Sequence, residues 1–467
     1  MVNFKSIAAS TLIATTVAST VIPFNAPTVD AATAKKATCS KTPKNVILMI
    51  GDGMGISQLG AYRYYKDNEK TPGLDKIFFD QYLVGSQLTI SDDEKLNITD
   101  SGAAGSALAT GVRTYNGAIS VDKNKKPVET VLEAYKKAGR STGLVATSEL
   151  THATPAVFAA HNESRKNEMD IAKQMTRTVK VGKYKRPIVD VMLGGGVDFF
   201  KQKDENGKVT LDLVKTLEKR SKFKYVTTRE AMLKEKNSKS SRLIGLFAPS
   251  AMSKDIDRPA EEPSLKEMTD TAISKLSKNK KGFFLMVEGS QPDWSGHAND
   301  LTGMMSEIAA FDKAYQSAVN YAKKDCNTLV IALADHATGG LSVGTGDKYE
   351  FHPKVVNNMK MTAEGLTAKL IEDGANIEKL ITDNIKFEDL STEERQAIVN
   401  AATAKDETAT LKAINKVVDV RANAGWGSLV HTGEEVHVYA YGPGKEKFAG
   451  VQHNIQNATN IKSFLKK

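Results

Sequence analysis

The sequence is poor in cysteine: 467 residues contain only Cys39 and Cys326, which have neither metal-binding nor redox spacing. Whether these two residues form a disulfide stays open, because a chain of this length can bury a core that needs no such bond. The sequence also lacks internal repeats and, after its N-terminus, low-complexity tracts. These absences argue against a disulfide scaffold, a solenoid or a disordered chain. They leave one large globular domain with insertions, or two or three smaller ones.

Arginine is scarce as well. Of the 64 Lys and Arg residues only 12 are Arg, and the net charge is +9. Lysine spread over solvent-facing positions favours solubility and attraction to polyanions, and no nucleic-acid-binding motif accompanies it. We therefore expect no specific nucleic acid partner, and at most a loose association with an anionic cell wall or membrane surface.

Long apolar runs are absent beyond the N-terminal segment, so we expect no transmembrane segment. Residues 1–34 combine Lys5, an apolar stretch broken by Ser and Thr, and small residues up to Ala34. This pattern is typical of a secretory signal peptide rather than of a membrane anchor. A lysine-rich linker, residues 35–44, follows. The mature protein should be secreted, extracellular or cell-wall associated, or periplasmic if the source has an outer membrane.

Short apolar runs, each followed by a polar turn, alternate with helical segments along the rest of the chain. They are Asn45–Ile50, Gly143–Thr147, Val189–Leu193, Arg242–Ala248, Phe283–Val287, Thr328–Ala334 and Val436–Tyr441. The alternation predicts an α/β fold, a three-layer αβα sandwich whose large, mostly parallel central sheet is covered by helices on both faces. Residues 352–425 are polar and helical in pattern, which indicates a peripheral helical insertion within a catalytic domain spanning 45–467.

Carboxylates and histidines stand at or just beyond the ends of these runs, namely Asp52, Glu288, Asp293, Asp335 and His336. The carboxyl ends of strands in an open α/β sheet converge on one crevice. Five of the eight histidines lie in or next to the same turns: His152, His161, His297, His336 and His431. Each residue alone would be an ordinary turn former or surface histidine. Together they predict a metal centre, because Asp and His suit zinc, while Asp, Glu and Thr oxygens suit magnesium.

The segment from Asp100 to Gly111 predicts a short buried helix, because Ser101 opens a run of small residues that closes on a glycine. Asp100 and Ser101 could be simple caps. Alternatively, Ser101 is a nucleophile at the positive end of the helix dipole. Thr154 followed by Pro155 predicts a second helix start, with Thr154 as its cap.

A Ser-His-Asp hydrolase is a competing interpretation of this serine. The sequence has no G-x-S-x-G elbow, and it has more carboxylates than a triad uses. Arg165 could instead offer a bidentate fork to two phosphate oxygens, and Ser101 could lose its proton to a metal ion without a histidine base.

Six separated segments resemble the motifs of the alkaline phosphatases, in that family's order. They are Ile50–Gly55, Thr99–Ser101, Gly111–Gly117, Val287–Gly289, Ala334–His336 and His431–Gly433. The resemblance runs from about Asn45 to the C-terminus and is weaker at 200–240 and 352–425. It implies a homodimer that hydrolyses phosphate monoesters to an alcohol and inorganic phosphate, and so scavenges phosphate outside the cell.

The resemblance also implies roles for individual residues. Ser101 would become phosphoserine, Arg165 would hold the transferred phosphoryl group, and Asp100 would orient Arg165. One zinc would be held by Asp293, His297 and His431. A second zinc would be held by Asp52, Asp335 and His336. A third, magnesium-type site would be framed by Asp52, Thr154 and Glu288.

Two positions depart from the best-studied bacterial pattern. His152 stands where that pattern has Asp, so zinc or cobalt could compete with magnesium at the third site. Trp294 stands where the pattern has Lys, which removes a positive charge near the phosphate and should weaken product binding.

Other readings of the same residues remain. A diesterase, a sulfatase and a cofactor-independent phosphoglycerate mutase belong to the same superfamily. Ser101 argues against the diesterases that use threonine, and Ala103 and Gly105 occupy the Pro and Arg positions of the sulfatase signature. An inactive, metal-stabilised secreted protein that binds phosphate or a surface is the alternative outside enzymology.

Overall fold

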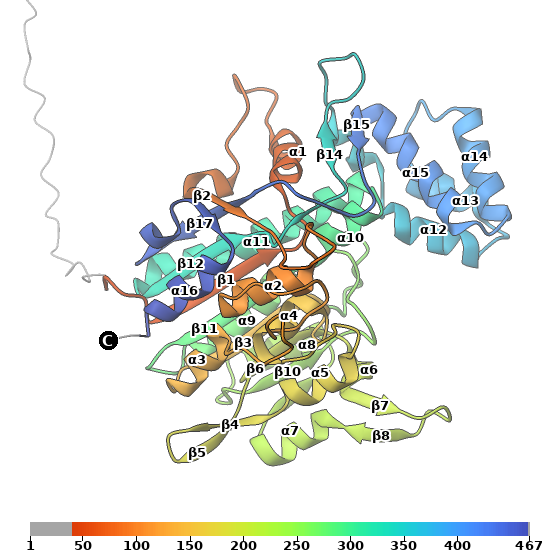
Figure 1. Cartoon of the computed structure of the whole chain (residues 1–467). Helices are drawn as coiled ribbons and strands as arrows, with labels where there is room; N and C mark the ends of the chain where they lie inside the picture. The colour runs from red at the N-terminus through yellow and green to blue at the C-terminus, as the bar shows by residue number, and fades with distance from the viewer. Residues whose placement is uncertain (1–39, 466–467) are drawn as a thin grey trace, which may run out of the picture. The chain divides into compact units, whose positions relative to one another are not determined.

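The computed structural model describes residues 40–465 of the chain (Figure 1), which belong to one compact unit. The predicted signal peptide (1–34), the first residues of the predicted linker and Cys39 lie outside the described residues. The two predictions for the N-terminal segment therefore stay as they were. None of the helices in 40–465 is long and apolar enough to cross a membrane.

Ten strands form the central sheet. Their order is β18 (Gly450–His453), β2 (Leu83–Leu88), β17 (Val436–Tyr441), β12 (Thr328–Leu333), β1 (Asn45–Gly51), β11 (Phe283–Gly289), β3 (Ser141–Glu149), β6 (Val191–Gly195), β10 (Leu243–Leu246) and β9 (Lys224–Val226). Of the nine neighbouring pairs, only the two that β17 makes with β12 and β2 are antiparallel. Every residue of β1, β11 and β12 is buried, as expected of parallel strands covered on both faces.

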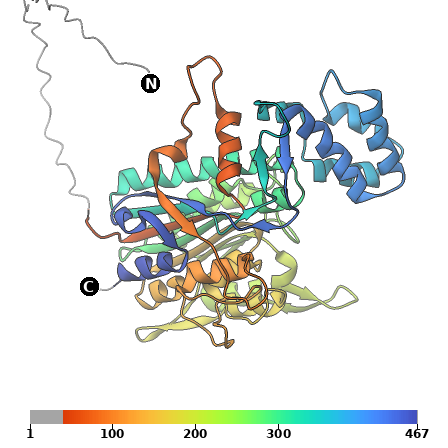
Figure 2. The ribbon, with the colours of Figure 1, turned by 45° about the horizontal axis from the view of Figure 1, so that its top comes forward.

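Alternate residues of β1 point into two separate hydrophobic cores. Ile47 and Met49 pack into the core that contains helices α1 (Ile56–Lys66), α8 (Arg229–Lys236), α9 (Leu265–Leu276) and α11 (Leu301–Asp325). Val46, Leu48 and Ile50 pack into the core with α2 (Ser101–Thr110), α3 (Val131–Lys137), α4 (Ala153–Ala159), α5 (Glu168–Met175), α6 (Val197–Phe200), α7 (Leu213–Ser221) and α16 (Ile455–Ser463). Figure 2 shows α1 and α11 on one side of the sheet and α2 on the other. The predicted three-layer αβα sandwich is confirmed.

The predicted helical insertion is also present, to one side of the sheet (Figure 1). It consists of η2 (Pro353–Asn358), α12 (Ala363–Glu372), α13 (Ile377–Asn384), α14 (Thr392–Thr403) and α15 (Glu407–Ala422). Asn415 Nδ2 on α15 donates to the carbonyl of Ala298 at 2.7 Å, just after α10 (Gln291–His297). The insertion therefore contacts the body of the protein close to one of the predicted metal ligands, His297.

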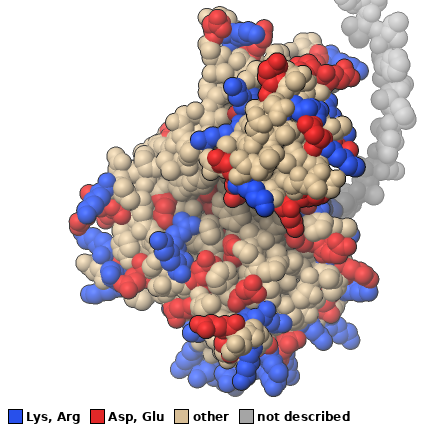
Figure 3. Space-filling model, turned by 90° about the vertical axis from the view of Figure 1, so that its right-hand side faces the viewer, with Lys and Arg blue, Asp and Glu red and all other residues tan. Residues whose placement is uncertain are grey.

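Short elements decorate the sandwich. They are the hairpins β4 (Thr178–Val181)–β5 (Tyr184–Pro187) and β7 (Lys201–Lys203)–β8 (Val209–Asp212), the pairs β13 (Ala337–Thr338)–β16 (His431–Thr432) and β14 (Leu341–Val343)–β15 (Ala424–Trp426), and the 3-10 turns η1 (Phe78–Tyr82) and η3 (Lys445–Phe448). Figure 3 shows acidic and basic side chains interspersed over most of one face, with Lys and Arg gathered at its lower end. Charge on that face is therefore unevenly distributed.

Candidate active site

Three carboxylates come together because their strands are neighbours. Strand β1 lies between β11 and β12 in the sheet, and Asp52, Glu288 and Asp335 stand at or just after the carboxyl ends of these strands. All three side chains are fully buried. The glycine that follows Asp52 allows a close approach: Gly53 has φ +69°, and a Cβ there would lie 2.5 Å from the Cα of Asp293. The crevice expected from the sequence thus exists at this edge.

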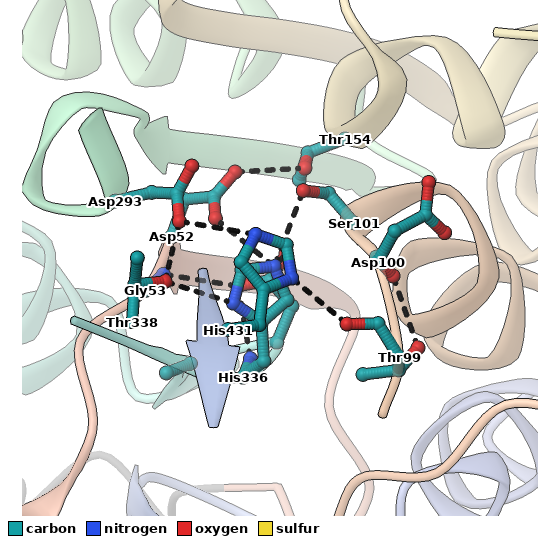
Figure 4. Close-up of polar contacts among 12 residues, drawn as sticks. Asp52, Gly53, Thr99, Asp100, Ser101, Thr154, Asp293, His336, Thr338 and His431 are labelled. Atoms are coloured by element: carbon teal, nitrogen blue, oxygen red, sulfur yellow. Dashed lines mark hydrogen bonds and ion pairs between the residues drawn. The ribbon is translucent and has the colours of Figure 1, made fainter. Parts of the chain in front are cut away.

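Helix α2 places Ser101 at the same edge. Asp100 caps it by accepting a hydrogen bond from the Ala103 N–H at 2.8 Å, and Gly111 ends it with φ +83°. All ten residues are buried, and a Cβ at Gly105 would lie 3.0 Å from Val157 Cγ2. The run of small residues is therefore required by close packing, and it presents Ser101 at the first turn of a buried helix (Figure 4).

The predicted ligands fall into three groups, in each of which the candidate ligand atoms lie within 4.8 Å of one another. The groups are Asp293, His297 and His431; Asp52, Asp335 and His336; and Asp52, His152 and Glu288. Thr154 joins the third group through its hydroxyl, which donates to Asp52 Oδ2 at 3.3 Å. The fold thus brings together all eight residues that the sequence proposed as metal ligands.

The geometry of His297 and His431 is that of a cation site. The Nδ1 atoms of His297 and His431 lie 2.7 Å and 2.8 Å from the carbonyl oxygens of Leu429 and Thr99, so each Nδ1 carries the proton in the neutral ring. The two Nε2 atoms, only 3.1 Å apart, then face each other with lone pairs. A shared cation relieves that repulsion, and a backbone carbonyl on the second nitrogen is the usual support of a metal-binding histidine.

His336 does not have the geometry of a triad base. Its Nε2 lies 3.2 Å from Ser101 Oγ, but the same nitrogen also lies 3.5 Å from Asp52 Oδ1 and 3.3 Å from Asp335 Oδ2. In a Ser-His-Asp triad the carboxylate holds the opposite nitrogen. Here the serine and both carboxylates converge on one atom, which suits a common metal ion rather than proton transfer.

Unpartnered buried atoms provide the test of fit for a metal. Within the described chain, three carboxylate oxygens of these groups are buried without a hydrogen-bond partner, namely Asp52 Oδ1, Asp335 Oδ2 and Glu288 Oε1. Such atoms are costly unless a ligand satisfies them. The residues present therefore fit bound cations.

Burial sets the charge state of this centre. Burial and the charge of nearby Asp293 raise the pKa of Asp335 to about 7. Burial also raises the pKa of Glu288 to about 8. Burial lowers the pKa of His336 and of His431 to about 4. The two histidines are therefore neutral at pH 7, which is the form that binds metal.

Arg165 is held from two sides. Its Nη1 donates to Asp100 Oδ2 at 3.0 Å, and its Nη2 lies 2.8 Å from His152 Nε2. The ring of His152 meets Trp294 edge-on, with centroids 5.7 Å apart. Each terminal nitrogen of the guanidinium keeps a second N–H, so the planar fork can still engage two oxygens of an anion.

Several supporting residues could not be read from the sequence. Thr338 Oγ1 donates to Asp293 Oδ1 at 2.5 Å, and Asn116 Oδ1 accepts from the Asp100 N–H at 3.0 Å. The sequence offered one indication of these two residues, their position: Thr338 stands two residues after His336, and Asn116 lies in the Gly111–Gly117 motif. His161 does not join the cluster, because its nitrogens lie 2.9 Å from the Ser120 carbonyl and 3.1 Å from Glu133 Oε1.

The predicted start of the second helix was wrong by two residues. Helix α4 begins at Ala153, with His152 at the N-cap position. Pro155 is still tolerated, because the first N–H groups of a helix need no intrahelical partner. The Thr154 hydroxyl is thereby free to reach Asp52 instead of capping.

Comparison with known proteins identifies the family. Residues 43–467 match the family model described as alkaline phosphatase. The chain is 48% identical over 437 residues to alkaline phosphatase 4 of Bacillus subtilis (strain 168), covering 92% of each chain. It resembles the crystal structure of a cold-active alkaline phosphatase from Shewanella sp. with a TM-score of 0.78 and 34% identity, covering 91% of this chain and 100% of that one.

A further similar structure has a bound metal ion. It is a TAB5 alkaline phosphatase variant with a histidine replaced by aspartate, and it has Mg bound in the M3 site (TM-score 0.66, 30% identity, covering 91% of this chain and 98% of that one). With the family model matching nearly the whole described part, this chain belongs to the alkaline phosphatase family of phosphate monoester hydrolases.

Proposed function

We propose that Ser101 is the nucleophile of phosphate monoester hydrolysis in this protein and that it forms a covalent phosphoserine. The observation that carries the proposal is the position of its hydroxyl, at the buried first turn of α2 and 3.2 Å from His336 Nε2. Ser101 thus lies against one metal-binding group, and it directly follows Asp100, which holds Arg165.

We assign one zinc ion to Asp293, His297 and His431 and a second to Asp52, Asp335 and His336, because Asp and His donors suit zinc. The group of Asp52, Thr154 and Glu288 offers oxygens and suits magnesium, with His152 as a nitrogen that could admit zinc or cobalt. When bound, the metal ions would lower the pKa of the Ser101 hydroxyl and of the hydrolytic water, and would offset the charge on the phosphoryl oxygens.

The chain's own groups then account for two displacements at phosphorus. Arg165 orients the phosphoryl group through its two free N–H groups, while Asp100 keeps the guanidinium in place. Ser101 Oγ forms a bond to phosphorus, the ester P–O bond breaks, and the alcohol leaves with a proton. Water next attacks the phosphorus, the bond to Oγ breaks, and Ser101 regains its proton as inorganic phosphate departs. The helix dipole of α2 favours the anionic serine.

The variant Ser101→Ala tests the nucleophile. We expect hydrolysis of p-nitrophenyl phosphate to fall by at least about a thousandfold, phosphate labelling of the protein after acid quenching to disappear, and the metal content to stay unchanged. Ser106→Ala, in the same buried helix, is the matched control and should keep its labelling. Retained activity or labelling in Ser101→Ala would show that another residue is the nucleophile.

The alternatives within the superfamily are separated by the substrate. A phosphomonoesterase should hydrolyse p-nitrophenyl phosphate faster than its bis-ester, and a faster bis-ester rate would favour a diesterase. We also propose that the protein is exported, scavenges phosphate outside the cell and acts as a homodimer. These points rest on the N-terminal sequence and on the family.

A further inference from the structure

A second concave site lies at the edge of the sheet opposite the catalytic centre. It is a groove of about 920 Å³ between the end of α3, the β4–β5 hairpin and the segments that lead into β6, β10 and β11. These segments are at the amino ends of strands whose carboxyl ends point toward the metal-binding groups. The groove therefore cannot be part of the catalytic crevice.

Half of the residues that line this groove are basic, and only one is acidic. Nine Lys and Arg residues line it, against the single carboxylate of Asp190. The basic residues are Lys136, Lys137, Arg140, Lys183, Arg186, Lys239, Arg242, Lys278 and Lys281. So high a ratio is not a consequence of the overall composition, in which 64 basic residues accompany 55 acidic ones.

The one carboxylate is already engaged by the floor of the groove. Asp190 Oδ2 accepts from Lys136 Nζ at 2.6 Å and from the Thr142 N–H at 3.0 Å, and its Oδ1 lies 3.7 Å from Arg242 Nε. Burial lowers the pKa of Lys136, and the charges of Arg242 and Arg186 lower it further. The positive groups are thus close enough to oppose one another.

The exposed rim has cations that no carboxylate balances. Lys137 pairs with Glu129 at 2.6 Å, but Lys183, Arg186, Lys239 and Lys281 have no carboxylate oxygen within 4.0 Å anywhere in residues 40–465. An anion in the groove would relieve this repulsion and contact several cations at once.

The shape and chemistry of the groove select among anions. Tyr184 is its only aromatic residue, and Arg186 and Lys183 already lie 5.1 Å and 5.5 Å from its ring centroid. One such ring offers no platform on which successive nucleobases could stack. Few apolar side chains are present to receive acyl chains, and a concave groove suits a flexible strand better than a flat membrane. We propose that this groove binds a linear polyanion made of polyol units joined by phosphodiesters, and so retains the enzyme on such a polymer.

The experiment uses the full, metal-loaded enzyme and purified poly(glycerol phosphate) as the probe. Binding is measured by isothermal titration at several salt concentrations around physiological ionic strength. In the variant Lys183→Glu/Arg186→Glu/Lys239→Glu we expect binding at least about tenfold weaker, with a shallower dependence of log K on log salt, because phosphate contacts are lost. Turnover of p-nitrophenyl phosphate should be unchanged, which separates this site from the catalytic one.

The matched control is Lys203→Glu/Lys208→Glu/Lys215→Glu, which changes the net charge equally on exposed lysines of the β7–β8 hairpin and α7. It should bind the polymer like the wild type. If the groove variant does not fold, the milder Lys183→Gln/Lys239→Gln replaces it, with at least about threefold weaker binding expected. An equal loss in the control would mean that net charge alone is responsible. Tighter wild-type binding to a single-stranded oligonucleotide or to phosphatidylglycerol vesicles at equal phosphate concentration would also overturn the proposal.

Discussion

At the scale of residues, the partner of each histidine nitrogen distinguishes ligands from other histidines. His297 and His431 each have Nδ1 on a backbone carbonyl and Nε2 turned to the metal-binding group. His161 places its two nitrogens on a carbonyl and on Glu133. The sequence indicated all three histidines by their nearness to strand ends, but it could not show which ring nitrogen contacts a carbonyl oxygen and which faces other ligands. That distinction depends on loops distant in the chain.

The identity of the metal bound at the third group tests the role of His152. Its Nε2 accepts a hydrogen bond from Arg165, so the neutral ring carries its proton on the buried Nδ1, which has no partner. Burial and Arg165 lower its pKa to about 3, so it stays neutral. We expect protein purified without added metal to hold zinc or cobalt besides magnesium at this group, because the lone pair of Nε2 can exchange its contact with Arg165 for a metal ion and is a softer ligand than oxygen.

The variant His152→Asp should then shift the third group toward magnesium alone. Carboxylate oxygens are the ligands that magnesium prefers. Elemental analysis of the wild type and the variant, purified in parallel, measures the change. Magnesium as the sole third metal in the wild type would contradict it.

At the scale of elements, the fully buried strands could be predicted from the sequence and the partly exposed strands could not. The predicted runs Asn45–Ile50, Phe283–Val287 and Thr328–Ala334 match β1, β11 and β12 to within two residues, because central parallel strands must be apolar along their whole length. The strands at or next to the two edges of the sheet, β18, β2 and β9, were not predicted, because exposed positions interrupt their pattern. Only pairing defines them: β2 pairs with β17 and β18, and β9 pairs with β10. The convergence of carboxylates was predictable because it needs only the central strands.

That convergence makes stability depend on metal and on pH. The pKa of Asp335 is raised to about 7 and that of Glu288 to about 8 by burial. For a carboxyl with a raised pKa, the contribution to stability is present at low pH and is lost as pH rises through the folded-state pKa. We expect the Tm of chelator-treated protein to fall from about pH 4, where these carboxyls ionise in the unfolded chain, to about pH 8, above which they are ionised in both states.

The metal-loaded protein should show a smaller fall, because bound cations balance the ionised carboxylates. The difference in Tm between the two forms should therefore widen with pH. Differential scanning calorimetry of both forms in matched buffers measures it. A constant difference across this range would mean that the carboxylates carry no such charge in the metal-free protein.

At the scale of the whole molecule, the two edges of the sheet have different chemistry. The carboxyl edge gathers carboxylates and neutral histidines in buried positions, and the amino edge gathers unbalanced cations around a groove. The sequence predicted the cluster of carboxylates and histidines from its motifs. Of the cationic groove it predicted only the positive net charge of the chain, because the cations come from four separate segments. The proposed dimer concerns a third surface, beside the catalytic centre.

Apolar side chains are exposed there without an intramolecular partner surface to cover them fully. Leu96 and Val430 are 58% and 62% exposed, and both line a hollow that also contains His297 and His431. A stable dimer buries more than about 1,200 Å² in total, and such a patch favours that interface.

We expect the wild type to sediment as a dimer at micromolar concentration and Leu96→Asp/Val430→Asp to sediment as a monomer. Val209→Asp/Val420→Asp, at similarly exposed positions on β8 and α15, should remain dimeric. A monomeric wild type would contradict the dimer, a dimeric Leu96→Asp/Val430→Asp variant would place the interface elsewhere, and equal dissociation of both variants would show that the added charge alone is responsible.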